Sequence, residues 1–419
     1  MTAHFRDRRS FVLLAIIPAI ALALGAQVTP DWIANYNSGV DALNAAHYTE
    51  AMRFLDAAAI QAREFPPHDA RRLRTTPALA MACQYSGALD RAEALFMESR
   101  NTLDASKPEE QAVLAFTLDG LSQLRYEQGK WFETEELLKP AYTHCVQSSG
   151  PHSLCAVTVL RHLGESYATL TKSTEAEKAL QEAIDIFRQT PALPKAALTS
   201  TLRSLASVYM LEGRASLAKP LFEESLDLSE KAQDLPAMGD SLLGLARMYR
   251  LLHNPARALP LLNKAVHLYE TADDVSLPTA LHELGLLSND EGKFAMAKQY
   301  LERATALILR SRGPGNIALA YIHVGLATAY LGERNYNAAA NHIQKAIEQE
   351  RALLPGPHGE LARAYLVAAV IEERRHQNSA ADGHYRQALE IYHSSSTSDS
   401  LDVKKAEELY ARFAKGYRK

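Results

Sequence analysis

The sequence predicts an all-α protein, an α-solenoid of about nine helical hairpins that ends in a capping helix. Small residues recur at intervals of 39 to 42 residues along most of the chain, and apolar residues follow them with the spacing of an amphipathic helix. A chain of 419 residues would otherwise divide into about two to four ordinary domains. Because one period runs through it, we expect a stacked array of similar units instead.

One small residue marks the first helix of each hairpin. These positions are Gly39, Ala80, Ser122, Gly164, Ala206, Ala246, Gly285, Ala327 and Ala369. In several units a leucine comes directly before it and a tyrosine follows three residues later, as Leu163 and Tyr167 do. Glycine stands seven residues after the small residue in four units, where a tight turn between two helices favours it.

The second helix of each hairpin carries a stripe of small residues around one large residue. Twelve residues after the small residue of the first helix comes an alanine in eight of nine units, and a large apolar or aromatic residue follows four positions later. The large residues are Leu55, Phe96, Leu138, Leu180, Phe222, Leu262, Leu301, Ile343 and Tyr385. A small residue follows three positions after each of them. These offsets share one helix face, so the stripe lets a neighbouring helix approach closely.

This pattern resembles the tetratricopeptide repeat, as the fourth unit shows with Leu163-Gly164, Tyr167, Ala176, Leu180 and Ala183. The 42-residue spacing, with Gly-Pro pairs between units at 150–151, 313–314 and 356–357, is similar to the long-helix variant of kinesin light chains. The resemblance implies a right-handed superhelix whose first helices line a concave, partner-binding groove. The Leu-Asn-Asn-Leu run of the kinesin light chain groove is replaced by sequences such as 160–163, Leu-Arg-His-Leu, so motor-cargo function is not implied.

The repeats are expected to fill residues 27–393, before a Ser-rich linker at 394–401. Residues 402–419 are expected to form the capping helix and a tail, because repeat arrays end in a polar cap. The polar residues that supply it are Lys404, Lys405, Glu407, Glu408, Arg412 and Lys415.

Residues 1–26 have the layout of an export signal. Arg6, Arg8 and Arg9 precede an apolar run at 11–24, and Gly25 and Ala26 follow it. The run is short for a membrane span and is interrupted by a proline, which favours a cleaved signal over a retained membrane anchor. The two adjacent arginines also resemble a twin-arginine export signal. We therefore expect a periplasmic or other envelope location, with secretion as the alternative.

Composition and motifs argue against several functions. The 45 basic and 49 acidic residues give a net charge of −4, which does not suit a protein that binds nucleic acid by neutralising phosphates. The sequence has no metalloprotease, phosphate-loop or dinucleotide motif, and a Ser-x-x-Lys match at 216–219 coincides with a packing position of a repeat. We expect neither catalysis nor a cofactor.

The groove implied by the resemblance can be projected from the repeat register. It takes the residues three before and one or four after each small position: Asp119, Gln123, Tyr126, Arg161, Glu165, Arg203, Arg247, Arg250, His282 and Asn289. Four of these are arginines, whose planar fork suits an acidic segment or a C-terminal carboxylate. The alternative is that the arginines pair with the chain's own carboxylates, with Glu165, Asp119 and Asp240 as candidates.

Two cysteines, Cys145 and Cys155, flank the turn between two units. A disulfide across this turn suits an exported chain, whereas unpaired thiols or a metal site with His144 and His152 are the alternatives. Cys83 stands in place of a repeat tyrosine and is expected in the core.

These features together predict an exported scaffold that binds protein or peptide partners in its groove. Two other interpretations remain. One is an adaptor tethered to the membrane by an uncleaved N-terminal helix, and the other is a regulatory subunit of an envelope enzyme complex.

Overall fold

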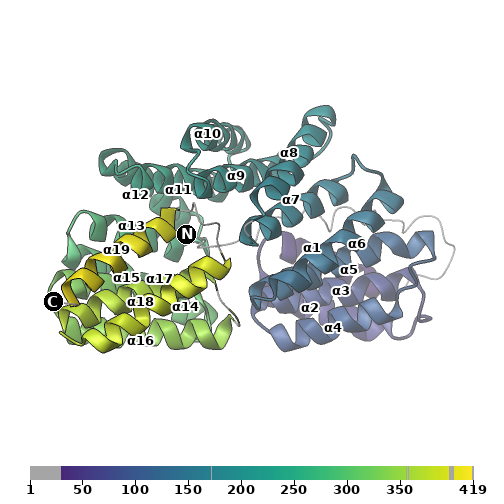
Figure 1. The fold of residues 1–419 in the computed structure, drawn as a ribbon. Helices are drawn as coiled ribbons and strands as arrows, with labels where there is room; N and C mark the ends of the chain where they lie inside the picture. The colour runs from purple at the N-terminus through teal and green to yellow at the C-terminus, as the bar shows by residue number, and fades with distance from the viewer. Residues whose placement is uncertain (1–29, 171, 355, 357, 396–400, 418–419) are drawn as a thin grey trace. The chain divides into compact units, whose positions relative to one another are not determined.

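The computed structural model describes residues 30–170, 172–354, 356, 358–395 and 401–417. These residues form nineteen α-helices and no β-strand (Figure 1). They divide into two compact units, one of residues 30–168 and 172–205 and the other of residues 206–417 with 169 and 170. We call them the N-terminal unit and the C-terminal unit and describe each separately.

The N-terminal unit contains four complete hairpins and most of a ninth helix. Its helices are α1 (Pro30–Asn44), α2 (Tyr48–Ala62), α3 (Ala70–Ser86), α4 (Leu89–Thr102), α5 (Pro108–Glu127), α6 (Trp131–Ser149), α7 (Leu154–Thr169), α8 (Ser173–Gln189) and α9 (Lys195–Leu211). The boundary with the C-terminal unit falls inside α9. Consecutive helices such as α1 and α2 or α5 and α6 make the most extensive contacts, as expected for hairpins.

The C-terminal unit continues the same pattern. Its helices are α10 (Ala215–Ala232), α11 (Leu235–Leu251), α12 (Pro255–Thr271), α13 (Leu277–Asp290), α14 (Phe294–Arg312), α15 (Ala318–Gly332), α16 (Tyr336–Leu353), α17 (Gly359–Arg374), α18 (Asn378–Ser395) and α19 (Leu401–Tyr417). Each of α11, α13, α15 and α17 packs on the helix that follows it and also on the hairpin before it. The predicted all-α solenoid of helical hairpins is confirmed.

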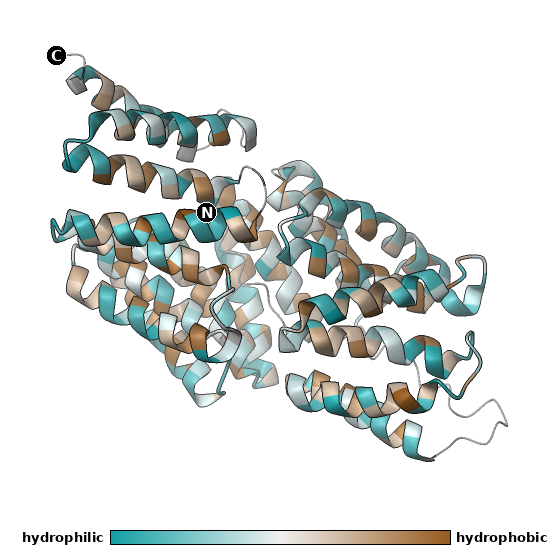
Figure 2. Ribbon diagram, turned by 90° about the horizontal axis from the view of Figure 1, so that it is seen from below, coloured by the Kyte–Doolittle hydropathy of each residue, from teal (hydrophilic) through white to brown (hydrophobic). Residues whose placement is uncertain are grey.

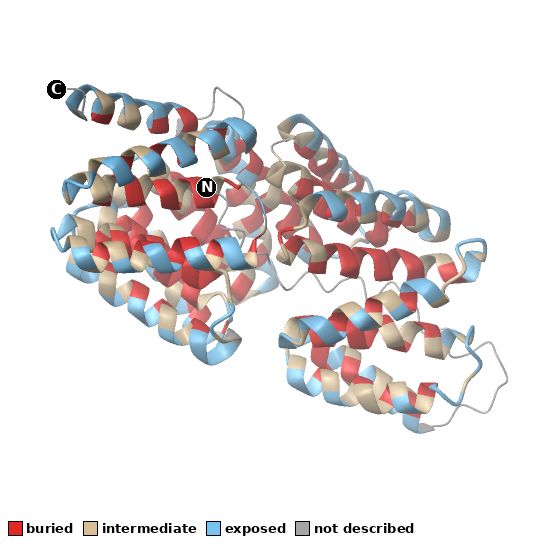
Figure 3. Ribbon diagram, turned by 60° about the horizontal axis from the view of Figure 1, so that its bottom comes forward, coloured by how far each residue is buried: buried red, intermediate tan, exposed pale blue. Residues whose placement is uncertain are grey.

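The small residues of the repeat are buried where helices pack against one another (Figure 3). Leu301 on α14 lies directly against Gly285 on α13, and a Cβ atom added to Gly285 would come within 2.6 Å of the Leu301 side chain. The stripe residues Ala297 and Ala304 on either side of Leu301 are fully buried. The small position therefore provides the space into which the large residue of the second helix inserts.

In the eight repeats whose turn lies within the described residues, one residue has positive φ, seven residues after the small position. Glycine occupies it with φ from 72° to 91° at Gly87, Gly129, Gly213 and Gly292. Where the sequence has another residue the backbone does not change: Ala46, His253, Arg334 and His376 have φ between 53° and 61°. The hairpin geometry therefore imposes this conformation even on residues that disfavour it.

Helix α19 covers the last hairpin. Val403, Ala406 and Phe413 are buried against α17 and α18, whereas the polar residues predicted to form the cap are exposed. Figure 2 shows the same division along the chain, with apolar residues on the faces where helices meet. Within the described residues, no helix is both long enough and apolar enough to span a membrane. The predicted signal at 1–26 and most of the predicted linker, residues 396–400, lie outside the described residues.

Candidate binding surface on the first helices of the repeats

The residues predicted to line a groove all lie on first helices of hairpins. In the N-terminal unit they occupy α5, α7 and α9, and in the C-terminal unit α11 and α13. Many are less accessible than an open groove requires: Asp119, Arg161 and His282 are at most 3% exposed. Gln123, Tyr126 and Arg203 are also buried, and only Glu165, Arg247, Arg250 and Asn289 are partly exposed. This differs from the expected exposed groove, because these side chains pack against neighbouring helices and bond to one another.

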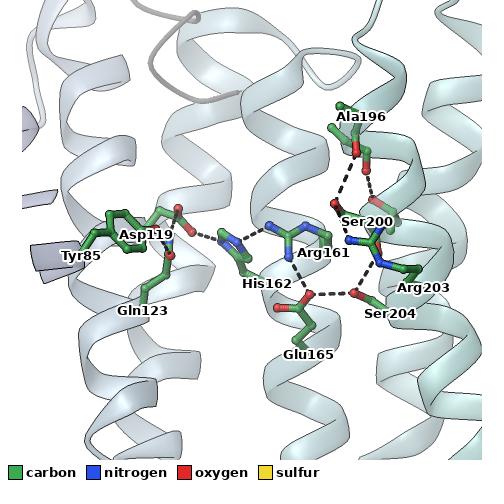
Figure 4. Close-up of polar contacts among 12 residues, drawn as sticks. Tyr85, Asp119, Gln123, Arg161, His162, Glu165, Ala196, Ser200, Arg203 and Ser204 are labelled. Carbon is green, nitrogen blue, oxygen red and sulfur yellow. Dashed lines mark hydrogen bonds and ion pairs between the residues drawn. The ribbon is translucent and has the colours of Figure 1, made fainter. Parts of the chain in front are cut away.

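A chain of polar contacts connects α5 and α7 in the N-terminal unit (Figure 4). Gln123 Nε2 donates to Asp119 Oδ2 at 2.9 Å, and Asp119 Oδ1 lies 2.5 Å from His162 Nδ1. Arg161 Nη2 lies 2.6 Å from His162 Nε2. Since a guanidinium can only donate, Nε2 accepts from Arg161 and Nδ1–H donates to Asp119. The neutral ring of His162 thus joins a buried carboxylate to a buried arginine.

The same chain continues from α7 to α9. Arg161 Nη1 donates to Glu165 Oε1 at 2.6 Å, and Ser204 Oγ donates to the same oxygen at 2.7 Å. Arg203 contacts Ser200 Oγ at 3.4 Å (Figure 4). Burial of these charges is tolerable because each is hydrogen-bonded and opposite charges adjoin. The network therefore holds three successive first helices in register.

A second polar cluster lies on α11 and α13 in the C-terminal unit. Glu283 accepts from Arg247 Nε at 2.7 Å and from Arg250 Nε at 3.3 Å. Arg250 Nη1 also donates to Asp290 at 3.0 Å. Burial by itself would raise the pKa of Glu283, but the attraction of Arg247 and Arg250 outweighs it and lowers the pKa to about 2. Glu283 is therefore ionised at neutral pH and shared by two arginines.

Three of the predicted residues in this second cluster have buried polar atoms that lack a hydrogen-bond partner within the described residues. These atoms are Nδ1 and Nε2 of His282, Nη2 of Arg247 and Oδ1 of Asn289. The amide of Asn289 is used on one side only, since Nδ2 donates to the Gly325 carbonyl of α15 at 2.9 Å. Buried polar atoms are nearly always satisfied in folded proteins, so these four are candidates for bonding a ligand or water.

Charges of both signs act on His282. Its pKa is lowered to about 4, mainly by burial; Glu283 raises the pKa, whereas Arg363, Arg247 and Arg250 lower it. The ring is thus neutral at physiological pH, with one nitrogen that donates and one that accepts. The cluster therefore offers both donors and acceptors of hydrogen bonds.

Predicted arginines pair with the chain's own carboxylates, which agrees with the alternative interpretation. Arg161 pairs with Glu165, and Arg247 and Arg250 pair with Glu283. Asp240, proposed as a partner, accepts from Tyr269 Oη at 2.6 Å.

Sequence reasoning missed several members of these clusters, among them His162, Ser204 and Glu283. All three stand two residues before the small position of their unit. The projected groove does not include the position two residues before the small residue, and that position identifies all three.

Cys145 and Cys155 are joined by a disulfide with a Cα–Cα distance of 5.4 Å. Both are buried, and the bond connects α6 to the start of α7 across the turn that contains Gly150. His144 Nδ1 lies 2.6 Å from Gln111 Oε1. In the part of the chain that the structure describes, no three His, Cys, Asp or Glu side chains are grouped to hold a metal ion. Cys83 is buried in the core of the N-terminal unit.

Comparison with known proteins agrees with this architecture. The family model described as "Tetratricopeptide repeat" matches residues 113–189, 197–271 and 276–352, more than half of the chain. Tetratricopeptide repeat protein 19 homolog, mitochondrial, from Drosophila melanogaster is 27% identical over 135 residues, which cover 31% of this chain and 36% of that protein. The chain thus spans only about a third of the length of this relative.

Several solved structures share the fold at low sequence identity. A Rap protein complexed with competence and sporulation factor has a TM-score of 0.64 at 12% identity, covering 90% of this chain and 99% of that one. The apo form of the quorum sensor NprR from B. thuringiensis has a TM-score of 0.57 at 12% identity, covering 86% and 98%. Aspartyl phosphate phosphatase F from Bacillus subtilis has a TM-score of 0.56 at 12% identity, covering 91% and 97%. With its repeat register, its stacked hairpins and the family match over most of the hairpins, this chain belongs to the tetratricopeptide repeat family.

Proposed function

We propose that this chain is an exported, non-catalytic scaffold that binds a protein or peptide segment on the first helices of its C-terminal unit. The observation that carries the proposal is the group of buried polar atoms without a partner on Arg247, His282 and Asn289. They belong to residues of α11 and α13, and they include both donors and acceptors.

The bonding capacity of this cluster fits an extended polypeptide, which reaches these buried atoms when the side chains that cover them move aside. A peptide main chain presents N–H and C=O groups that both need partners. Asn289 Oδ1 can accept from such an N–H, and the neutral His282 ring can accept with one nitrogen and donate with the other. Arg247 Nη2 can donate to a carbonyl or a carboxylate.

The charges favour an acidic segment or a C-terminal carboxylate as the ligand. Arg247 and Arg250 share the single buried carboxylate of Glu283, and Arg363, which lies 3.6 Å from Glu360, adds positive potential at His282. Asp290 offsets Arg250 but its side chain is 51% exposed, so water screens it. The corresponding cluster of the N-terminal unit is a poorer candidate, since Arg161 is already bonded to Glu165 and to His162.

The proposal agrees with what one protein of similar fold is named as binding. The Rap protein structure is described as a complex with competence and sporulation factor. At 12% identity this supports a tetratricopeptide array as a suitable framework for a ligand, without assigning the same ligand here.

Export is part of the proposal and rests on the sequence of residues 1–26. The disulfide between Cys145 and Cys155 supports it, because such bonds persist in oxidising compartments. Intact mass of the protein isolated from its native cells tests the point. A mature N-terminus near Ala26 is expected, whereas a chain that begins at Met1 and sediments with membranes would support the tethered adaptor instead.

The binding surface is tested with a displayed library of random peptides, selected on the full chain. We expect the selected peptides to be enriched in Asp, Glu or a free C-terminus. Replacement Arg247→Gln is expected to weaken their binding at least tenfold. The matched control is Arg310→Gln, which changes an exposed arginine of α14 in the same unit. Peptides without acidic enrichment, or equal weakening by both replacements, would contradict the proposal.

A further inference from the structure

One hairpin has histidines at two positions of the repeat that are leucines in other units. The first position lies four residues before the small position on the first helix. The second lies three residues after the first stripe residue on the second helix. In three other units these positions hold the leucine pairs 118 with 137, 202 with 221 and 242 with 261. In the hairpin of α15 and α16 they are His323 and His342. Two imidazole rings at these positions bury less apolar surface than two leucines would. Packing alone therefore does not explain the histidines.

The two rings meet at their Nδ1 atoms. His323 Nδ1 and His342 Nδ1 are 3.1 Å apart, and the ring centroids are 5.1 Å apart with an interplanar angle of 50°. Tyr330 stacks on the other side of His342 at 5.3 Å and 14°. Both histidines are half-buried, so solvent reaches the pair while the helices hold it in place.

Both rings are neutral at physiological pH. The pKa of His323 is lowered to about 4, mainly by burial and to a smaller extent by His342 and Lys345. Burial and then Lys345 also lower the pKa of His342. A neutral imidazole has a lone pair on one ring nitrogen, which is the form that binds metal ions.

We propose that His323 and His342 together bind one divalent transition-metal ion of the class of Zn²⁺, Ni²⁺ and Cu²⁺ through their Nδ1 atoms. Two nitrogens at about 2.0–2.1 Å from one metal ion are separated by about 2.9 to 3.4 Å for ligand angles between square and tetrahedral. The observed 3.1 Å lies within this interval. Imidazole ligands favour this class of ion over Mg²⁺ or Ca²⁺, which prefer oxygen.

The metal ion takes the place of a shared proton. Without metal, one Nδ1–H donates to the other Nδ1. When the ion binds, that proton sits on Nε2 of the same ring, so both Nδ1 lone pairs face the metal and neither ring changes charge. Within the described residues no third His, Cys, Asp or Glu completes the group. Water or an atom of a bound partner therefore fills the other coordination positions.

The neighbouring charges determine how tightly we expect this site to bind a metal ion. Lys345 acts on both rings, and Lys298 lies over the Tyr330 ring at 4.8 Å. These positive charges oppose a cation, so two neutral ligands should give a weak, exchangeable site. The competing explanation is a hydrogen-bonded pair of neutral histidines with no affinity for metal.

Calorimetric titration of the tag-free full chain with Zn²⁺ at neutral pH, after removal of metals with a chelator, separates the two explanations. We expect one site that is lost, or weakened at least tenfold, in both His323→Leu and His342→Leu. Either replacement introduces the leucine that other repeats have at that position, so the fold should be retained. His384→Leu is the matched control, since His384 occupies the same position in the next hairpin and stacks on Tyr365 instead. Mg²⁺ should not compete.

Equal Zn²⁺ binding by the wild-type chain and both leucine variants would overturn the proposal, as would no binding at all. A spectroscopic measurement on the unmodified chain avoids dependence on the variants. Cu²⁺ bound at the site should show electron paramagnetic coupling to two imidazole nitrogens. Coupling to none or to only one would likewise overturn the assignment.

Discussion

A buried carboxyl group in the C-terminal unit should make the protein less stable as the pH rises. Glu350, in the last turn of α16, is fully buried, and neither carboxyl oxygen has a hydrogen-bond partner within the described residues. Burial raises its pKa to about 8, Glu360 adds to the effect, and Arg363 opposes it only in part. The carboxyl group therefore stays protonated in the folded chain at neutral pH.

The sign and size of the effect follow from linkage. Between the unfolded pKa of 4.5 and the folded pKa of about 8, the unfolded chain releases a proton that the folded chain retains. Stability is thus fully present below 4.5 and is lost progressively as the pH rises through about 8. Glutamine has the same shape and never ionises. We expect Glu350→Gln to stabilise the fold by about 3 to 5 kcal/mol at pH ~8 and by less than about 1 kcal/mol at pH ~5.

Unfolding by urea at these two pH values measures the difference between the variant and the wild type. Because repeat arrays can unfold in parts, hydrogen exchange of α16 and α17 should accompany it to report the local free energy. Glu348→Gln, which removes an exposed carboxylate of the same helix, is the control. If the stability gained by Glu350→Gln does not grow with pH, or if the variant is less stable than the wild type at pH ~8, Glu350 is not protonated in the folded chain.

Three further predictions concern the turns, the disulfide and the buried ion cluster. Ala46→Gly should stabilise the fold by about 0.5 to 1 kcal/mol and Gly213→Ala should destabilise it by a similar amount, because both positions have positive φ; thermal unfolding checks both signs. Replacing Cys145 and Cys155 with alanine should destabilise the α6–α7 region by about 3 kcal/mol, the loop-closure value for a separation of 10 residues, and limited proteolysis should then cut this region faster. Glu283→Gln should cost about 3 to 5 kcal/mol in urea unfolding, because it leaves two arginines without their buried partner, and a loss below about 1 kcal/mol would contradict the cluster.

The fold could be predicted because the same spacing recurs in nine units. Each unit provided an independent indication of the two helix faces, and the residues of the stripe, such as Ala297 and Leu301, are buried as expected. The turns were predicted only where glycine marks them. At Ala46, His253 and Arg334 the stacking of the helices imposes positive φ on residues that do not favour it, and no local signal reveals this.

The helices that carry the candidate residues could be predicted from the sequence, but the hydrogen bonds between their side chains could not. Repeat register correctly placed the predicted residues on first helices, because register depends only on helix periodicity. Which atoms bond depends on the lateral fit of neighbouring helices. That fit buries Arg161 between His162 and Glu165, and it gives Glu283 two arginines from the preceding hairpin. The export signal at 1–26 remains a prediction.

A double-mutant cycle between Arg247→Gln and the acidic group of a selected peptide ligand tests the proposed binding surface. Affinities are measured for the wild-type chain and the variant, each with the peptide and with its amide counterpart. If Arg247 contacts the ligand's carboxylate, the two changes should be coupled by about 1 kcal/mol or more. Additive effects, with no coupling, would show that the ligand binds elsewhere and would contradict the proposed surface on α11 and α13.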